Sequence, residues 1–84
     1  MTNQQTIIPA KNLHGSNMDS LREQYINAMS KVRDAVETMR EDIDFHSRDY
    51  ADSNHFEQAR KQRREMIVKL MDVYIYLEDI ASSI

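Results

Sequence analysis

Histidines and aspartates gather in the middle of the chain, and these residue types can bind a metal ion. His46 and His55 stand among Asp42, Asp49 and Asp52, and Asp42 precedes His46 by the four residues that separate neighbours on a helix. A di-iron helical bundle needs a glutamate three residues before its ligating histidines, and neither histidine has one. The sequence has no cysteine for a thiolate metal site, and a zinc site would need further ligands supplied across a dimer. We therefore expect no metal and no cofactor.

A run of basic residues, Arg60-Lys61-Gln62-Arg63-Arg64, precedes the most apolar part of the chain. It is similar to the basic region of leucine-zipper proteins, where an asparagine is followed eight positions later by an arginine. Here Asn54 is followed by Gln62 at that spacing, and the formal net charge of −3 disfavours nucleic acid. Three interpretations remain: an internal salt-bridge face, a partner surface formed by Arg60, Lys61 and Arg64, or a DNA-binding region.

No group of residues predicts an enzyme. The sequence contains nothing that resembles a nucleophile–base pair, a phosphate-binding loop or a paired-carboxylate cleft, and so small a helical protein offers no deep pocket. Four tyrosines and six methionines could line an adaptable groove for another helix, but their helical spacing is more typical of a core.

Composition indicates a single small helical domain. The chain has 84 residues, of which 30% are charged and 40% hydrophobic. Its first residues lack the basic start and apolar run of a signal peptide. Lys69 and Asp72 interrupt the most apolar stretch, residues 66–84. We therefore expect a cytoplasmic protein with no membrane span.

The distribution of proline and glycine divides the chain into two parts. Residues 1–17 hold the only proline, Pro9, and the only glycine, Gly15, so we expect a flexible N-terminal arm. A docking peptide, TIIPAKNL, is the alternative interpretation of this arm. Residues 18–84 contain neither proline nor glycine and should form a helical hairpin.

Apolar residues at steps of three and four predict both helices of this hairpin. The first should run from about 20 to 49, capped by Ser20 with Glu23 or by Asn17. A turn at about 50–54 should precede a second helix from about 55 to 82, capped by Asn54; one continuous helix is the alternative. The first apolar line is Tyr25, Met29, Val32, Val36, Met39, Ile43, His46 and Tyr50. The second is Phe56, Ala59, Arg63, Met66, Leu70, Val73, Leu77, Ile80 and Ile84, flanked by Ile67, Met71, Tyr74 and Ala81.

The fold expected from these patterns is an all-α antiparallel hairpin that pairs as a homodimeric four-helix bundle. Acidic residues of the first helix (Glu37, Glu41, Asp42 and Asp44) should face the basic run. A hairpin covers only one side of each helix, so a second copy should cover the rest, with a hetero-complex as the competitor and the orientation open. The expected self-association core is Tyr25, Met29, Val32, Val36, Met39, Ile43, Met66, Leu70, Val73, Leu77 and Ile80.

The helical body from Met18 to Ile84, MDSLREQYINAMSKVRDAVETMREDIDFHSRDY and onward, resembles the small helical proteins of the lambdoid phage early region, between the recombination and excision genes. That resemblance implies a regulator that influences phage development or host physiology through protein contacts, in the host cytoplasm. In architecture the chain is also similar to the needle-subunit co-chaperones of type III secretion, which implies a subunit of a hetero-complex. DNA binding through the basic run is the second alternative.

Overall fold

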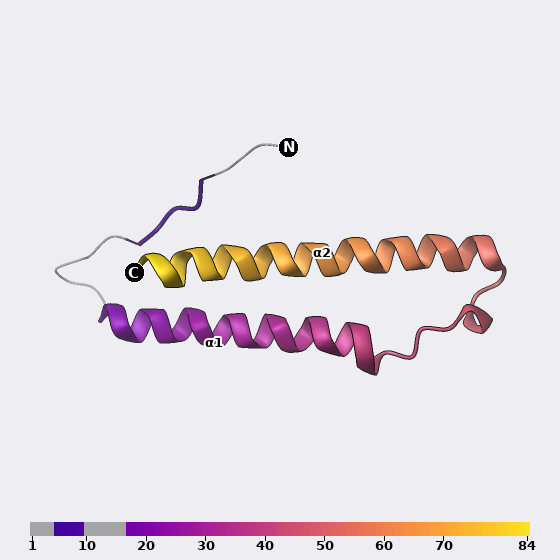
Figure 1. The fold of residues 1–84 in the computed structure, drawn as a ribbon, viewed down its shortest axis with the longest axis horizontal. Helices are drawn as coiled ribbons and strands as arrows, with labels where there is room; N and C mark the ends of the chain where they lie inside the picture. The colour runs from indigo at the N-terminus through magenta and orange to yellow at the C-terminus, as the bar shows by residue number, and fades with distance from the viewer. Residues whose placement is uncertain (1–4, 10–16) are drawn as a thin grey trace.

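The computed structural model describes residues 5–9 and 17–84, and the regular structure in this part of the chain consists of helices with no strand. Helix α1 spans Met18–Glu37, and helix α2 spans Ser53–Ser83. The two helices run antiparallel, side by side (Figure 1). The all-α prediction with two helices is confirmed. The expected flexible arm falls mostly on residues 1–4 and 10–16, which lie outside the described residues.

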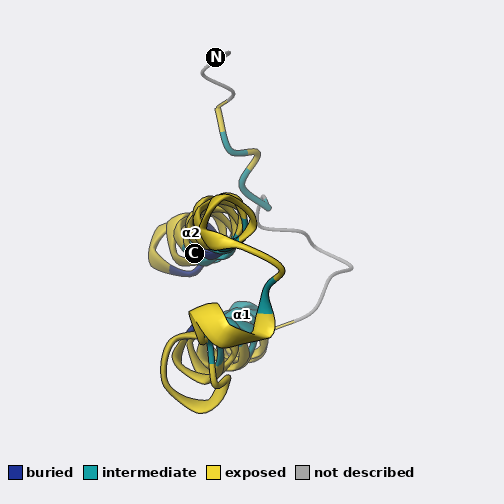
Figure 2. Cartoon of the chain, turned by 90° about the vertical axis from the view of Figure 1, so that its right-hand side faces the viewer, coloured by how far each residue is buried: buried dark blue, intermediate teal, exposed yellow. Residues whose placement is uncertain are grey.

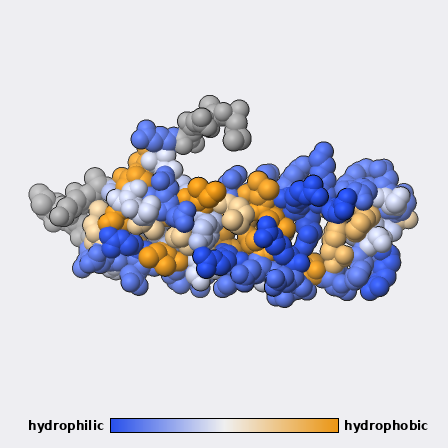
Figure 3. Space-filling view, in the orientation of Figure 1, coloured by the Kyte–Doolittle hydropathy of each residue, from blue (hydrophilic) through white to orange (hydrophobic). Residues whose placement is uncertain are grey.

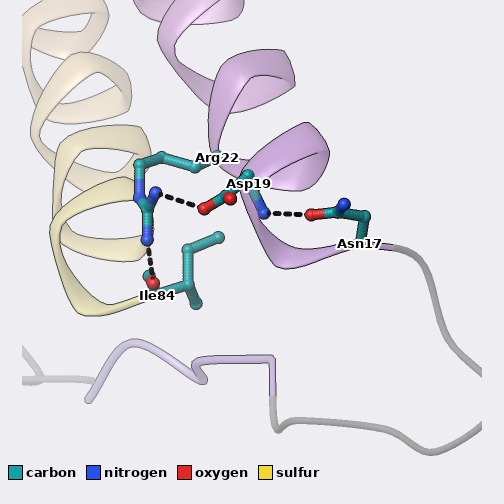
Figure 4. Close-up of polar contacts among 4 residues, drawn as sticks. All are labelled: Asn17, Asp19, Arg22 and Ile84. Carbon is teal, nitrogen blue, oxygen red and sulfur yellow. Dashed lines mark hydrogen bonds and ion pairs between the residues drawn. The ribbon is translucent and has the colours of Figure 1, made fainter.

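Asn17 caps α1. Its side-chain oxygen accepts a hydrogen bond from the amide of Asp19 at 2.8 Å, and its carbonyl accepts one from the amide of Leu21 at 3.0 Å (Figure 4). An asparagine at this position satisfies an amide that the helix itself leaves without a partner. The cap is therefore the second of the two predicted, and Ser20 lies inside the first turn.

Helix α1 ends twelve residues before the expected end at about residue 49, which corrects that prediction. After Glu37 the chain makes one π-helical turn (Thr38–Asp42), closed by a hydrogen bond of 3.1 Å from the amide of Ile43 to the carbonyl of Thr38. Ile43 itself is extended and 51% exposed, so it does not continue the apolar line.

An aromatic cluster explains why the helix stops. Phe45 follows Val36 by nine residues, which is two and a half helical turns, so a continuous helix would place Phe45 on the side away from α2. By leaving the helix, the chain brings the ring centroid of Phe45 to 5.0 Å from that of Phe56 and 5.6 Å from that of Tyr50. Such aromatic pairs contribute about 0.5–1.5 kcal/mol beyond area burial. The connection between the helices is therefore residues 43–52, not a tight turn at 50–54.

Asp52 caps α2 two residues before the predicted cap, Asn54, which is another correction. The Asp52 carboxylate accepts a hydrogen bond from the amide of His55 at 2.8 Å, and the Asp52 carbonyl accepts one from the amide of Phe56 at 3.1 Å. A short 3-10 turn (Ser47–Asp49) precedes this cap. An aspartate at the cap also places negative charge at the positive end of the helix dipole.

The core is a single seam between α1 and α2. Buried and half-buried residues lie on the sides of the two helices that face each other, and the outer sides are exposed (Figure 2). Only Val36, Ile67, Ile80 and Ala81 are fully buried among the described residues. Ile67 and Ala81 belong to the apolar line that flanks the main apolar line predicted for this helix. Helix α2 is therefore rotated about its own axis by part of a turn, relative to the orientation that the main line predicts.

The ends of the two helices are joined at the open end of the hairpin. The Arg22 guanidinium forms an ion pair with Asp19 at 3.0 Å and donates a second hydrogen bond to the carbonyl of Ile84 (Figure 4). Pro9 lies beside this end, next to Met18 and Ile84.

Candidate interaction surface

The seam residues of α2 define which side chains remain available for other molecules. They are buried or half-buried and recur at steps of three and four, with buried Ile80 next to the last of them: Phe56, Ala59, Arg63, Ile67, Leu70, Tyr74, Leu77 and Ala81. One residue corresponds to about 100° of helical turn. A residue that follows a seam residue therefore lies on one side of the hairpin, and a residue that precedes one lies on the other side. Because the helices are antiparallel, the same rule selects the same side for α1.

Exposed apolar residues line the side of the hairpin that is formed by residues directly after a seam residue in the chain. Val68 follows Ile67 and is 54% exposed, and Ile75 follows Tyr74 and is 56% exposed. Met71 lies between them, and Ile26, which follows half-buried Tyr25, adds an exposed side chain from α1. We call these four residues the Val68 face. In the space-filling view, apolar residues gather over α2 and along the middle of the molecule, while the end with the connection is mostly hydrophilic (Figure 3).

A second apolar group lies on the opposite side. Met66 and Val73 precede the seam residues Ile67 and Tyr74, and each is 44% exposed. Tyr76 precedes Leu77 and is also exposed. We call these three residues the Met66 face. Met66 and Val73 belong to the predicted self-association core, and in the single chain they are available for contact.

The other members of that predicted core lie along the seam, apart from Ile43. Val36 and Ile80 are buried, with exposed fractions of 4% and 1%. The rest are half-buried: Tyr25, Met29, Val32, Met39, Leu70 and Leu77.

The basic run divides into one structural residue and three surface residues. Arg63 donates a hydrogen bond to the carbonyl of Met39, and its guanidinium carbon lies 5.2 Å from the ring centroid of Phe45. Arg60 pairs with Glu57 of its own helix at 2.7 Å. Arg64 and Lys61 are exposed. The predicted face of salt bridges between the helices is therefore wrong, because no ion pair joins α1 to α2 within residues 17–84.

Arg40 joins this basic surface, although the sequence pattern did not single it out. It lines one open hollow together with Arg60, Arg63 and Arg64, and Ile67 and Val68 form the apolar part of the lining. The sequence did contain a signal for the position of Arg40. Met39 and Arg63 lie on either side of the same connection, so their neighbours in the chain lie close together across the seam.

Arg33 and Tyr74 provide a second polar link between the helices. The Arg33 guanidinium donates a hydrogen bond of 2.6 Å to the Tyr74 hydroxyl and lies 5.5 Å from its ring centroid. This hydrogen bond raises the pKa of Arg33 above its ordinary value. Arginine is protonated well beyond neutral pH, so this link keeps its charge at any working pH.

The histidines and aspartates do not come together as one site. His46 pairs with Asp44 at 2.6 Å and His55 lies 3.7 Å from Asp52. Across the described ranges 5–9 and 17–84, no three potential metal ligands form a group. None of the helices there combines the length and apolar character that crossing a membrane requires.

Comparisons with protein-family models, curated proteins and solved structures found no match. The described surface consists of two apolar faces on opposite sides of one hairpin, with a basic surface toward the connection.

Proposed function

We propose that this protein is a small non-enzymatic regulator that forms a homodimeric four-helix bundle and acts through contacts with another protein. The observation that carries the proposal is the presence of exposed apolar side chains on both sides of the seam, the Val68 face and the Met66 face. Burial of apolar surface is the main favourable term in protein association.

The small core supports self-association. Ordering a residue costs about 1.5 kcal/mol, and a single seam with four buried side chains offsets little of that in so short a chain. A second hairpin packed against one side would cover one apolar face and supply further core. The opposite face would then remain for a different protein.

The biological setting is part of the proposal and comes from the resemblance of residues 18–84 to lambdoid phage early-region proteins. In that setting the protein acts in the host cytoplasm and biases phage development or host physiology. Arg60, Lys61 and Arg64 are exposed and form the polar part of the proposed partner surface.

A subunit or co-chaperone of a hetero-complex is the second candidate, and one observation favours it. The seam leaves apolar residues exposed on both sides, whereas a two-fold dimer covers only one side of each hairpin. A hetero-complex could cover both.

Light scattering across a wide concentration range distinguishes the two candidates. We expect a molar mass of twice the 9.9 kDa chain at micromolar concentration and above. A mass of one chain at all concentrations would contradict the homodimer and leave the hetero-complex as the better interpretation.

A further inference from the structure

Charge is distributed unevenly along α2. Residues 53–69 carry five lysines and arginines against two glutamates, whereas residues 70–83 carry three acidic residues and no lysine or arginine. The first half of the helix is therefore positive and the second half is negative. Two such helices repel each other when parallel and attract each other when antiparallel.

The same polarity is present on the Val68 face. Arg60 and Arg64 follow the seam residues Ala59 and Arg63, so they extend this face toward the start of α2. Glu78 follows Leu77 and extends it toward the end of α2. All three side chains are exposed. Glu57 follows the seam residue Phe56 on this side and is paired with Arg60. From Arg60 onward the order along this side is basic, apolar, acidic.

The spacing on this face is symmetric. Arg64 lies seven residues before Met71, and Glu78 lies seven residues after it. A two-fold axis near Met71 would therefore bring each Arg64 opposite Glu78 of the second copy. The same axis would bring Val68 close to Ile75 of the second copy. In an isologous interface, each contact made by one copy is repeated by the other.

The Met66 face lacks this pattern. Residues that precede the seam residues include Gln62, Met66, Lys69, Val73 and Tyr76, with a single charge. A second copy docked there would gain no charge complementarity along its length. The Val68 face also has a large exposed apolar residue from α1, Ile26, whereas α1 adds only the small side chain of exposed Ala35 beside the Met66 face.

We propose that the second copy docks on the Val68 face, with the two α2 helices antiparallel and related by a two-fold axis near Met71. This inference rests on the proposed homodimer and specifies its surface, orientation and register. It differs from the expectation that Met66 and Val73 lie in the self-association core, and it leaves the Met66 face open for another protein.

Charge reversal at the two ends of the face tests the orientation. In Arg64→Glu each glutamate would face Glu78 of the second copy, and in Glu78→Arg each arginine would face Arg64. We expect each variant alone to dissociate about tenfold to a hundredfold more readily, because two ion pairs become two repulsive pairs. An equimolar mixture of the two variants should recover the wild-type dissociation constant, because both pairs are attractive again in the mixed dimer.

Disulfide crosslinking tests the register, since the sequence has no cysteine of its own. A mixture of Val68→Cys and Ile75→Cys should form the mixed disulfide on mild oxidation, whereas either variant alone should not. The matched control is the pair Met66→Cys and Val73→Cys, which occupies the equivalent positions on the other face and should stay uncrosslinked.

The outcomes separate this inference from the proposed function. If wild type is a monomer at all concentrations, the homodimer itself is contradicted, and the inference fails with it. If wild type is a dimer that both charge variants leave unchanged, the Val68 face is not the interface, but the homodimer remains. Crosslinking of Val68→Cys to itself would overturn the antiparallel orientation, because a parallel pair brings identical residues together.

Discussion

At the scale of single residues, Arg63 connects α2 to the segment between the two helices. It extends from α2 to the carbonyl of Met39, in the π-helical turn that follows α1, and its guanidinium lies over the ring of Phe45. Phe45 in turn packs against Phe56 of α2. A basic residue within an apolar seam is stable here because its charge has a carbonyl and an aromatic ring as partners.

We predict that Arg63→Met destabilises the protein although methionine is apolar and of similar length. Loss of the hydrogen bond and of the cation–π contact should lower the free energy of unfolding by about 1–3 kcal/mol. Urea unfolding followed by circular dichroism at one fixed protein concentration measures this change. The control is Lys31→Met on the exposed side of α1, which should shift stability by less than about 0.5 kcal/mol. Equal effects of the two substitutions would contradict the assigned role of Arg63.

At the scale of elements, the lengths of the helices are decided at the connection. Helix α1 stops where continuing would expose Phe45, and α2 starts where Asp52 can accept the amide of His55. The π-helical turn Thr38–Asp42 ends α1 and turns the chain toward the aromatic cluster. Such turns are rare and shift the following residues around the helix axis.

We predict that Asp52→Ala lowers the free energy of unfolding by about 1 kcal/mol, because the first turn of α2 loses its cap. Thermal or urea unfolding at a fixed concentration measures the change. Asp49→Ala, an exposed aspartate in the adjacent 3-10 turn, is the matched control and should change stability by less than about 0.5 kcal/mol. If both variants lost the same stability, loss of negative charge and not loss of the cap would be the cause.

At the scale of the whole molecule, the chain is long and thin. Its extents are 59 × 29 × 16 Å and its radius of gyration is 17.8 Å. A compact chain of this length would have a radius of gyration of roughly 12 Å. The shape leaves a large surface for each buried side chain, which is why we propose that a second copy completes the core.

Small-angle scattering tests how two copies pack. Side-by-side docking along α2 should keep the longest dimension of the dimer near the 59 Å of one chain, because a two-fold axis near Met71 lies close to the middle of the helix. End-to-end docking would roughly double that dimension. A doubled length together with a dimeric mass would contradict docking on either apolar face.

The sequence alone determined the helical class, the presence of two helices, and the candidate caps that include Asn17. These properties depend on neighbours within a few residues: the absence of proline and glycine, the three-and-four spacing of apolar residues, and short polar side chains at the first turn. Val36, Leu70 and Ile80 could be placed on inward faces for the same reason.

Only the tertiary structure decided where α1 ends and which part of the broad apolar arc of α2 faces α1. The line through Ile43, His46 and Tyr50 continued the helical spacing, but contact between Phe45 and Phe56, on either side of the start of α2, stabilises a different path. Ile67 and Met66 differ by only one position in the pattern, yet one is buried and the other is exposed. Helical periodicity is a local property, whereas the choice between overlapping faces depends on the shape of the helix that packs against them.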